Sequence, residues 1–358
     1  MPTFCRQLVV GRSRAALLIV AAVQLGVLAA CGGGGGYGGG GGNMPVAGVG
    51  PSKLFAADST HSVVGSLANP DPAAGALTVD RLIGPQPGAI PYNYAQFSTN
   101  IGSLALDATR DILYAGNGTS VRVFYGASMA NGDIFASASI GPIGNTGSMF
   151  LDAASDRLYV GDDANGVKVF SAASTANGTP TPRAITGNFG TTFQIHGVPV
   201  DTTANDILYV SNTNHTTSSD QVSVFDGAST VSGSVSPNRT ITPTISGTPQ
   251  TVGGISLDAI HNVLYVAGGS ASTQIMVFTG ASTANDVSGA TAPSKILTMP
   301  SGMLNVVVDA THDRLYAVGF NGHIYLVENV STLSSGAATA KDASVSGGML
   351  TAVAVNPS

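Results

Sequence analysis

The sequence predicts an all-β protein, a six-bladed β-propeller built from four-stranded antiparallel blades. The main support is a repeat: the stretch LDAASDRLYVGDDANGVKVF at 151–170 returns, with variation, along most of the chain. Successive copies begin about 40–50 residues apart, the length of one propeller blade. Short alternating apolar runs separated by Gly and Asn turns are typical of strands. No stretch after Cys31 keeps a 3.6-residue apolar period, so almost no helix is expected.

The first 30 residues are predicted to be an export signal. Three arginines and no acidic residue precede an apolar run at 15–28. This run is short for a membrane-spanning helix, which needs about 20 apolar residues, although an uncleaved anchor is the alternative. The tetrapeptide LAAC, ending at Cys31, resembles the bacterial lipobox. That resemblance implies a lipid on Cys31, with membrane lipid as a partner. Because Gly32 follows where an aspartate would mark inner-membrane retention, it also implies an outer-membrane lipoprotein of the cell envelope, periplasmic or surface-facing.

Residues 31–52 are predicted to be the lipidated cysteine and a flexible tether, and residues 53–358 the propeller. The glycine-rich run after Cys31 behaves as a random coil with a reach of about 18 Å. Cys5 leaves with the signal and Cys31 carries the lipid, so no disulfide is expected. Without the signal the chain has 11 basic and 20 acidic residues, a formal charge of −9. This acidic balance disfavours nucleic acid and anionic headgroups as partners.

Each repeat contains four predicted strands. The first is apolar and ends in Asp or Asn, the second carries a Leu-Tyr pair, and the third alternates as a strand with one buried face does. The fourth follows an AST-ANG turn and carries Pro with a basic residue, which suit an outermost edge because they block pairing with another molecule. The second-strand pairs that count the blades are Leu54-Phe55, Leu113-Tyr114, Leu158-Tyr159, Leu208-Tyr209, Leu264-Tyr265 and Leu315-Tyr316.

The two ends of the repeat region complement each other. The first copy starts in its second strand, at Leu54, and so lacks an inner strand. The last copy is followed by a spare strand, Thr351–Val355, which ends in Asn356 where the other inner strands end in Asp. We expect this strand to join the first blade, close the ring and remove two open edges.

The sequence pattern VVVD followed by LYAV, at 306–318, resembles the repeat pattern of NHL-repeat and related six-bladed propellers. The resemblance covers 53–357 and implies the fold rather than an activity. Similar repeat patterns occur in seven-bladed lactonase-like propellers, so the prediction of six blades depends on the count of the six second-strand pairs. Enzymes of this superfamily hold a metal with Glu, Asn, Asp or His around the channel. The one Glu here, Glu328, ends a third strand, toward the opposite face.

The candidate site lies on the face where the turns between strands two and three gather around the channel mouth. The residues that end the Leu-Tyr strands there, a possible polar ring, are Asp58, Asn117, Asp162, Asn212, Gly268 and Gly319. The alternative is that these Asp and Asn residues close their own turns. Asp162 and Asp163, with Asp58, could hold Ca²⁺, which takes six to eight oxygen ligands. No calcium-loop spacing is present, and no other cofactor is expected.

His196, in FQIHG before the fourth inner strand, is expected at the channel mouth, either as an acid or base or simply as a solvated side chain. Asp pairs such as Asp107/Asp111 recur in nearly every blade, and a catalytic pair should appear once, so we interpret them as turn formers. Long insertions at Asn188–Gly197, Ser211–Gln221 and Ser246–Gly254 are expected to crowd the same face, where recognition is often placed.

Three functions remain open from the sequence. The leading hypothesis is a monomeric, non-catalytic binding scaffold for an envelope protein or glycan. The alternative is a metal-assisted hydrolase or lactonase that uses Asp58, Asp162, Asp163 and His196. The third is a structural role in envelope assembly. The chain contains no HExxH or zinc-spaced cysteine motif that would favour the enzyme.

Overall fold

The computed structural model describes residues 54–67, 75–76, 78–85, 97, 101–163, 165–187, 189, 193–214, 219–269, 272–286, 290–345 and 348–356. The predicted signal peptide, the lipidation site Cys31 and the tether lie outside these residues. The described residues belong to one compact unit, Pro45–Ser358. No described helix is long and apolar enough to cross a membrane.

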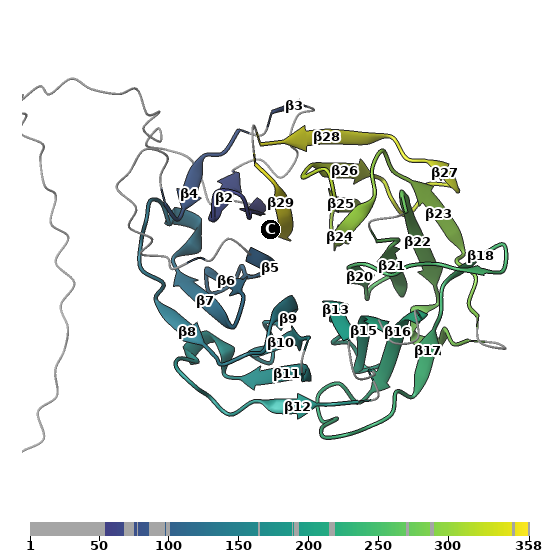
Figure 1. Cartoon of the computed structure of the whole chain (residues 1–358), viewed down its shortest axis with the longest axis horizontal. Coiled ribbons are helices and arrows are strands. Elements are labelled where there is room, and N and C mark those ends of the chain that lie inside the picture. Colours follow the sequence, from purple (N-terminus) through teal and green to yellow (C-terminus); the bar gives the residue numbers. More distant parts are fainter. Residues whose placement is uncertain are drawn as a thin grey trace, which may run out of the picture. The chain divides into compact units, whose positions relative to one another are not determined.

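The unit is a six-bladed propeller, as predicted, in which each blade is an antiparallel sheet (Figure 1). From the inner to the outer strand, blade 1 is β29 (Leu350–Val355), β1 (Leu54–Asp58), β2 (Val63–Leu67) and β4 (Arg81–Ile83); blade 2 is β5 (Ile101–Asp107), β6 (Ile112–Asn117), β7 (Ser120–Tyr125) and β8 (Ala138–Ile140); blade 3 is β9 (Thr146–Asp152), β10 (Arg157–Asp162), β11 (Gly166–Ser171) and β12 (Arg183–Ile185). Blade 4 is β13 (Phe193–Gly197) with β14 (Val200–Asp201), β15 (Ile207–Asn214), β16 (Ser219–Asp226) and β17 (Arg239–Ile241); blade 5 is β20 (Ile255–Asp258), β21 (Val263–Ala267), β22 (Gln274–Thr279) and β23 (Lys295–Thr298); blade 6 is β24 (Met303–Asp309), β25 (Arg314–Gly319), β26 (Ile324–Glu328) and β28 (Ala340–Ser344).

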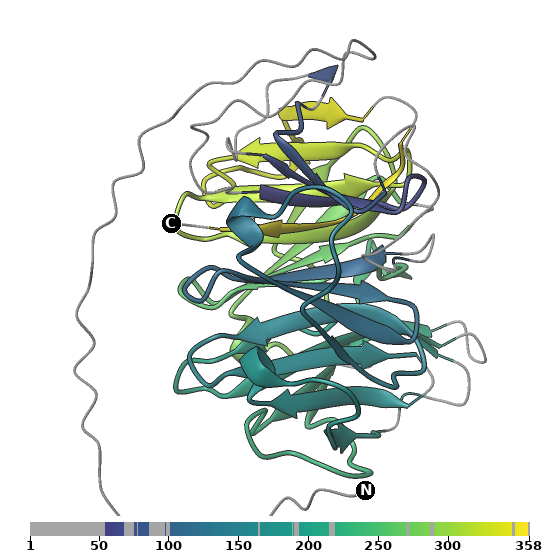
Figure 2. The ribbon, with the colours of Figure 1, turned by 90° about the vertical axis from the view of Figure 1, so that its left-hand side faces the viewer.

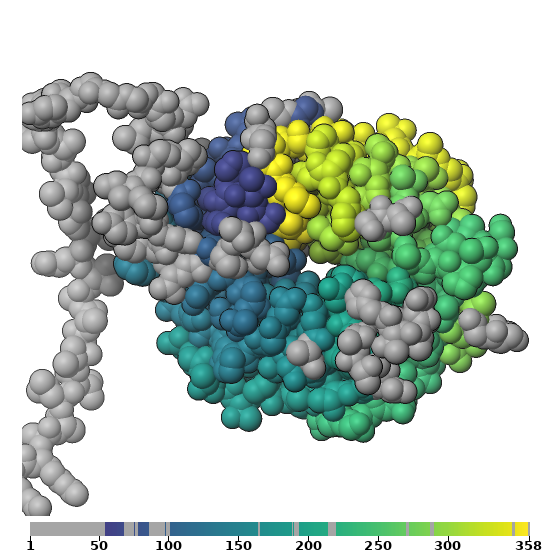
Figure 3. Space-filling view, in the orientation of Figure 1, coloured from purple at the N-terminus to yellow at the C-terminus, as the bar shows by residue number. Residues whose placement is uncertain are grey.

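The C-terminal strand closes the ring. β29 pairs with β1 from Leu54–Val355 onward, which supplies the inner strand that the first copy lacks. Thr351 Oγ1 also donates a hydrogen bond to the carbonyl oxygen of Ile101 in blade 2, at 2.7 Å. In the space-filling view the first strands, in purple, lie directly against the last one, in yellow (Figure 3). The predicted closure is confirmed.

A second closed ring runs around the outside. The outermost strand of each blade pairs in parallel with a residue of the next blade, and we call these pairings the outer belt. The six pairs are Ile83–Gly132, Ile140–Gly178, Ile185–Gly233, Pro243–Thr291, Leu297–Gly336 and Ala343–Gly75, the last one returning to blade 1. Gly132, Gly178 and Gly233 have φ of 88°, 72° and 79°, a region that glycine adopts readily. The fourth strands are therefore the outermost ones, as predicted, and each blade is also joined to the next by one or two residue pairs at the end of this strand or just after it.

The basic residues of these strands also act on the next blade rather than on solvent. In blades 1, 3, 4 and 5 the first residue of the strand donates to a backbone carbonyl oxygen in or just after the turn that follows the third strand of the next blade: Arg81 to Ser128, Arg183 to Ala228 and Val231, Arg239 to Ala284, and Lys295 to Ser331. Lys341 of blade 6 instead pairs with Glu328 of its own blade, at 3.2 Å. Blade 2 has Ala138 at this position, paired with Val123 as Arg183 is paired with Val169. There the hydroxyl of Tyr125 donates to Ser174 O instead, at 2.9 Å.

The repeated Asp pairs are turn formers, as predicted. The first acid caps its own turn: Asp107 Oδ1 accepts from the backbone N–H groups of Thr109 and Arg110. The second residue binds both the backbone N–H and the hydroxyl of a serine in the turn that follows the third strand. Its five examples are Asp111–Ser128, Asp156–Ser174, Asp206–Ser229, Asn262–Ser282 and Asp313–Ser331. These contacts lie on the face opposite the channel mouth.

The core is divided among the spaces between adjacent blades, which we call seams. Each seam is filled by apolar side chains from two neighbouring sheets, for example Tyr159 and Val169 of blade 3 with Leu208 and Phe225 of blade 4. Seen edge-on, the strands cross the thickness of the ring between its two faces (Figure 2). Among the described residues, the apolar packing that stabilises the propeller therefore lies between neighbouring sheets rather than in one central core.

The predicted insertions are mostly ordered β structure. Part of Asn188–Gly197 is the inner strand β13, which stops before Val198-Pro199 and resumes as β14. Much of Ser211–Gln221 extends the β15–β16 pair as far as Asn214–Ser219. The segment Ser246–Gly254 includes part of a small hairpin, β18 (Thr244–Ile245) with β19 (Thr248–Pro249), which lies at the outer rim rather than around the mouth (Figure 1). The described parts of the first two segments thus extend strands on the predicted face, and Val252 N donates to Asp220 Oδ2 at 3.0 Å between the third segment and the second. Only the hairpin departs from the prediction.

Candidate functional site: the axial cavity and the blade seams

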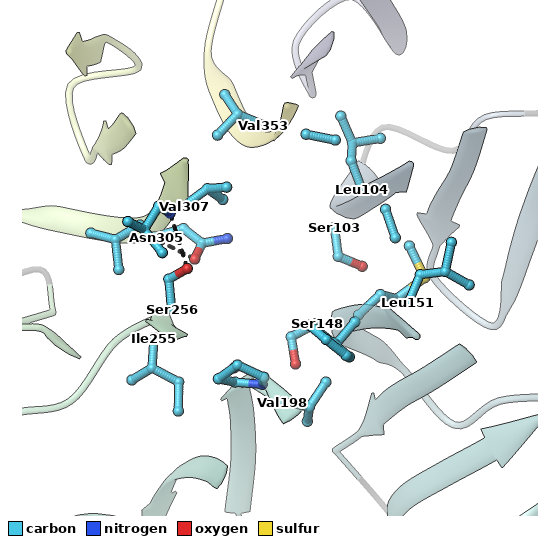
Figure 4. Close-up of a pocket in the computed structure, with 18 of the residues that line it drawn as sticks. Ser103, Leu104, Ser148, Leu151, Val198, Ile255, Ser256, Asn305, Val307 and Val353 are labelled. Atoms are coloured by element: carbon cyan, nitrogen blue, oxygen red, sulfur yellow. Dashed lines mark hydrogen bonds between the residues drawn. The ribbon is translucent and has the colours of Figure 1, made fainter. Parts of the chain in front are cut away.

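An axial cavity of about 230 Å³ lies where the six inner strands face one another (Figure 4). Each inner strand is the last strand of its sheet, so the backbone groups on its far edge point toward the axis. Contacts between neighbouring inner strands join some of these groups: Ser256 Oγ accepts from Val308 N at 3.0 Å, and Gly254 N donates to Leu304 O at 3.0 Å. The cavity is thus lined both by backbone polar groups of the inner strands and by their side chains.

Most of the side-chain walls are aliphatic. The residues just before the terminal Asp or Asn of five inner strands form a half-buried apolar ring, which consists of Leu106, Leu151, Leu257, Val308 and Val355. Toward the predicted mouth the lining becomes more polar, with Ser103, Ser148, His196 and Asn305. Such a cavity suits a small or narrow ligand with an apolar part and a hydrogen-bonding end.

His196 lies in the inner strand β13 and lines the axial cavity, where the sequence placed it. Its Nε2 lies 3.2 Å from Thr213 Oγ1 on the adjacent strand β15. Of the six residues predicted to bind ligand, it alone is among the described lining residues of this cavity.

Asp163 lies beside His196 and connects two blades. Its Oδ2 accepts from Asn145 Nδ2 at 2.6 Å, and its Oδ1 accepts from the backbone N–H of Ile195, in blade 4, at 2.9 Å. Burial raises the pKa of the Asp163 carboxyl, and these two hydrogen bonds and the nearby His196 partly oppose that rise. Asp163 is therefore a partly buried acid with a structural contact on each oxygen.

The other four predicted residues point into the seams. Asp58, Asn117, Asp162 and Asn212 are all buried, with at most 7% of their surface exposed. Asp162 accepts from Gly144 N at 2.9 Å and forms an ion pair with Lys168 at 2.8 Å. Asn212 Oδ1 accepts from Ser223 Oγ at 3.2 Å. The polar ring predicted from the sequence is a set of contacts between strands and loops, distributed around the propeller.

Each residue of this ring is matched to a residue on the adjacent third strand. Polar strand ends accompany polar third-strand residues, and glycine ends accompany large apolar ones. The matched residues are diagonal neighbours, each two positions beyond the residue directly opposite the strand end: Asn117 with Arg122, Asp162 with Lys168, Asn212 with Ser223, Gly268 with Met276, and Gly319 with Tyr325. A Cβ added to Gly319 would lie 2.9 Å from the Tyr325 ring, so the glycine makes room for the tyrosine. In blade 1 the equivalent pair is Asp58 with Gly65, and the rule fails there.

Serine and glycine also face each other near the mouth. Ser103 pairs with Gly116 in blade 2 and Ser148 with Gly161 in blade 3, whereas blade 4 reverses the order with Gly197 and Ser211. A Cβ on Gly116 would lie 2.3 Å from Ser103 Oγ. The serines were not predicted as site residues, although they stand at the same distance from the terminal Asp of their strands and could have been found by aligning the repeats.

The described residues contain no group of three His, Cys, Asp or Glu side chains placed to hold one metal ion. Asp58 lies in blade 1, with blade 2 between it and Asp162, so these carboxylates do not meet. A calcium site that combines them is not assembled by the fold. Calcium binding elsewhere stays a prediction.

Together the fold and the cavity define the class: a six-bladed β-propeller with an axial cavity lined by aliphatic side chains and polar groups. Comparison with protein-family profiles and with curated proteins finds no match to the sequence. Among solved structures the chain is similar to the WD40 β-propeller domain of Doa1, with a TM-score of 0.48 and 10% sequence identity. That alignment covers 82% of this chain and 79% of the other.

Proposed function

We propose that this protein is a lipid-anchored binding scaffold of the bacterial cell envelope, whose propeller engages an envelope protein or glycan at the mouth of the axial cavity. The observation that favours binding over catalysis is that the mouth carboxylates already have structural partners: Asp162 and Asp163 accept hydrogen bonds from the loop before β9 and from strand β13 of blade 4. Removing either from these contacts to serve a reaction would leave buried polar groups without partners, at about 1–3 kcal/mol each. The propeller itself fits a binding role, because its rigid blades present one face to a partner.

The anchor is the first part of the proposal to test. The lipobox-like LAAC predicts that the mature protein starts at a diacylated Cys31 and fractionates with membranes. Cys31→Ser should remain unprocessed or move to the soluble fraction, and mass spectrometry of the amino-terminal peptide measures the lipid directly. Recovery of an unmodified Cys31 from membranes would contradict the anchor.

The binding face is tested by site-specific photo-crosslinking in cells. A crosslinking residue at position 196 should trap a defined envelope partner, because His196 lines the cavity. The matched control is position 312, a histidine on the opposite face that is paired with Asp309 at 2.8 Å. Equal crosslinking from both positions would contradict recognition at the mouth.

The hydrolase or lactonase alternative is supported by one observation, the raised pKa of Asp163 next to His196. It requires that His196→Gln abolishes turnover of a lactone or ester panel while the propeller stays folded. Measuring turnover with and without added Ca²⁺ or Zn²⁺ separates the metal-assisted form of this alternative from the scaffold.

A further inference from the structure

A second cavity, of about 240 Å³, lies on the side of blade 1 that faces blade 6. Its described walls come mainly from β1, β2 and the start of β29, and include Ala56, Val63, Leu67 and Leu350. They are apolar except for Asp58 and its partner His61 at the rim. This cavity is separate from the axial cavity, and its chemistry depends neither on the lipid anchor nor on His196.

The cavity borders a position from which the third strands of the other blades extend a side chain; in blade 1 this position is Gly65, and Val79 lies against it, 3.1 Å from where a Cβ would stand. Gly65 pairs with Ala56 in blade 1 as Lys168 pairs with Val160 in blade 3. The equivalent residues in the remaining blades are Arg122, Ser223, Met276 and Tyr325. Blade 1 is thus the one blade whose third strand puts no side chain into this part of its seam.

Blade 1 has the acidic residue of this arrangement, Asp58, but Gly65 stands where blade 3 has the basic residue Lys168. Asp58 ends its strand as Asp162 does, and in blade 3 that carboxylate is paired with Lys168 Nζ at 2.8 Å. Asp58 is equally buried, with 3% of its surface exposed. In blade 1 the carboxylate therefore lies next to an apolar channel, in the position that an aliphatic ammonium side chain fills in blade 3.

The carboxylate of Asp58 has room for one more donor. Its Oδ1 accepts from three backbone N–H groups, those of Thr60, His61 and Met349, at 2.9–3.3 Å. Its Oδ2 contacts Nδ1 of the half-exposed His61 at 2.6 Å. Each carboxylate oxygen offers about two lone-pair sites, so Oδ2, which has a single partner among the described residues, can accept a second hydrogen bond.

We propose that this cavity binds a small free primary alkylammonium ion, with the ammonium group on Asp58 Oδ2 and the carbon chain against Val63, Leu67 and Leu350. A buried carboxylate favours a cation, and apolar walls favour an unbranched chain. A divalent metal is disfavoured because it needs about six oxygen ligands or more. At roughly 30 Å³ for each water-sized group, the volume accepts a chain of about four or five carbons with its ammonium group.

Binding is measured on the intact propeller by calorimetry and by thermal unfolding with n-butylammonium and 1,5-diaminopentane. Both should bind and raise the melting temperature, because a ligand that binds only the folded state stabilises it. n-Butanol, which has the same chain without the charge, should bind at least tenfold more weakly. Equal affinity for butanol and butylammonium would overturn the proposal.

Two variants locate the site. Asp58→Asn keeps the Oδ1 acceptor of the turn and should weaken butylammonium binding at least tenfold. Asp258→Asn is the matched control, because Asp258 binds His261 at 2.6 Å in the same way but lines no described cavity, and it should leave binding unchanged. If Asp58→Asn fails to fold, Val63→Phe fills the cavity without altering the carboxylate and should also remove binding. Unchanged binding in either cavity variant would contradict the site.

Blade 3 provides a positive control. Lys168→Gly removes the side chain that blade 1 lacks, and n-butylammonium should restore part of the lost melting temperature. Rescue of this variant without any binding to the wild-type cavity would overturn the proposal. Tighter binding of Nα-acetyl-lysine amide than of every free amine would also contradict it, because the occupant would then be a lysine of a protein.

Discussion

Arg183 Nη2 lies 2.8 Å from the carbonyl oxygen of Ala228, and this hydrogen bond joins the outermost strand of blade 3 to the turn after β16 of blade 4. Tyr159 OH donates to the same carbonyl oxygen, at 3.2 Å. The contact recurs around the ring with different donors, so adjacent blades are joined at their outer ends as well as through their seams.

Arg183→Met should lower the free energy of unfolding by about 1.5–3 kcal/mol, because it removes a charged donor from two carbonyl oxygens while keeping most of the apolar stem. Tyr125→Phe, which removes one neutral hydrogen bond from the equivalent place in blade 2, should cost about 0.5–1.5 kcal/mol. Urea denaturation measures both. A larger loss for the tyrosine variant would show that the arginine contact is not the stronger one.

The second position of the Asp pairs should tolerate substitution by asparagine but not by alanine. Asp156→Asn reproduces the natural Asn262–Ser282 contact and is expected to change stability little. Asp156→Ala loses two hydrogen bonds to Ser174 and places alanine at a φ of 52°, so it should cost about 1–3 kcal/mol. Equal stability of the two variants would contradict the role assigned to the carboxylate.

Serine and glycine at the mouth should be energetically coupled. Gly116→Ser alone places a side chain against Ser103, whereas the double variant Ser103→Gly/Gly116→Ser copies the arrangement of Gly197 and Ser211 in blade 4. A double-mutant cycle should therefore give a favourable coupling of about 0.5–3 kcal/mol. Additive effects would mean that the two positions do not compete for the same space.

The pKa of Asp163 should make stability depend on pH. Because burial raises this pKa in the folded state, the folded protein binds the proton more tightly than the unfolded chain does. The stabilisation from that proton is fully present below the unfolded value of about 3.9 and is lost as pH rises through the folded value. Unfolding of wild type and Asp163→Asn between pH 3 and 7 should show wild type losing stability relative to the variant as pH rises. A constant difference would contradict the shift.

Ring closure should depend on the last strand. Deletion of residues 350–358 removes β29, including the buried Leu350 and Val353, and exposes the edge of β1, so the protein should aggregate or melt at a lower temperature. A synthetic peptide of residues 348–358 should restore part of the stability by strand addition. A scrambled peptide is the control, and rescue by that peptide as well would argue against specific pairing.

The sequence by itself determined the fold of the propeller. Repeat period, alternation and the Leu-Tyr pairs are local features, and they predicted six blades, the missing inner strand at Leu54 and its replacement by Thr351–Val355. The turn capped by Asp107 is also local, so its role could be predicted from the sequence, whereas the serine partner of Asp111, 17 residues away, could not.

Only the tertiary structure decided what the polar residues contact. Sequence position places Asp58, Asn117, Asp162 and Asn212 on one face, but twist and packing turn their side chains into the seams. The partners Lys168, Arg122 and Ser223 lie on neighbouring strands, and the outer belt joins residues 38 or more positions apart. Such contacts depend on how two sheets pack against each other, which no local pattern encodes, and the cavity at Gly65 becomes visible only when the six seams are compared.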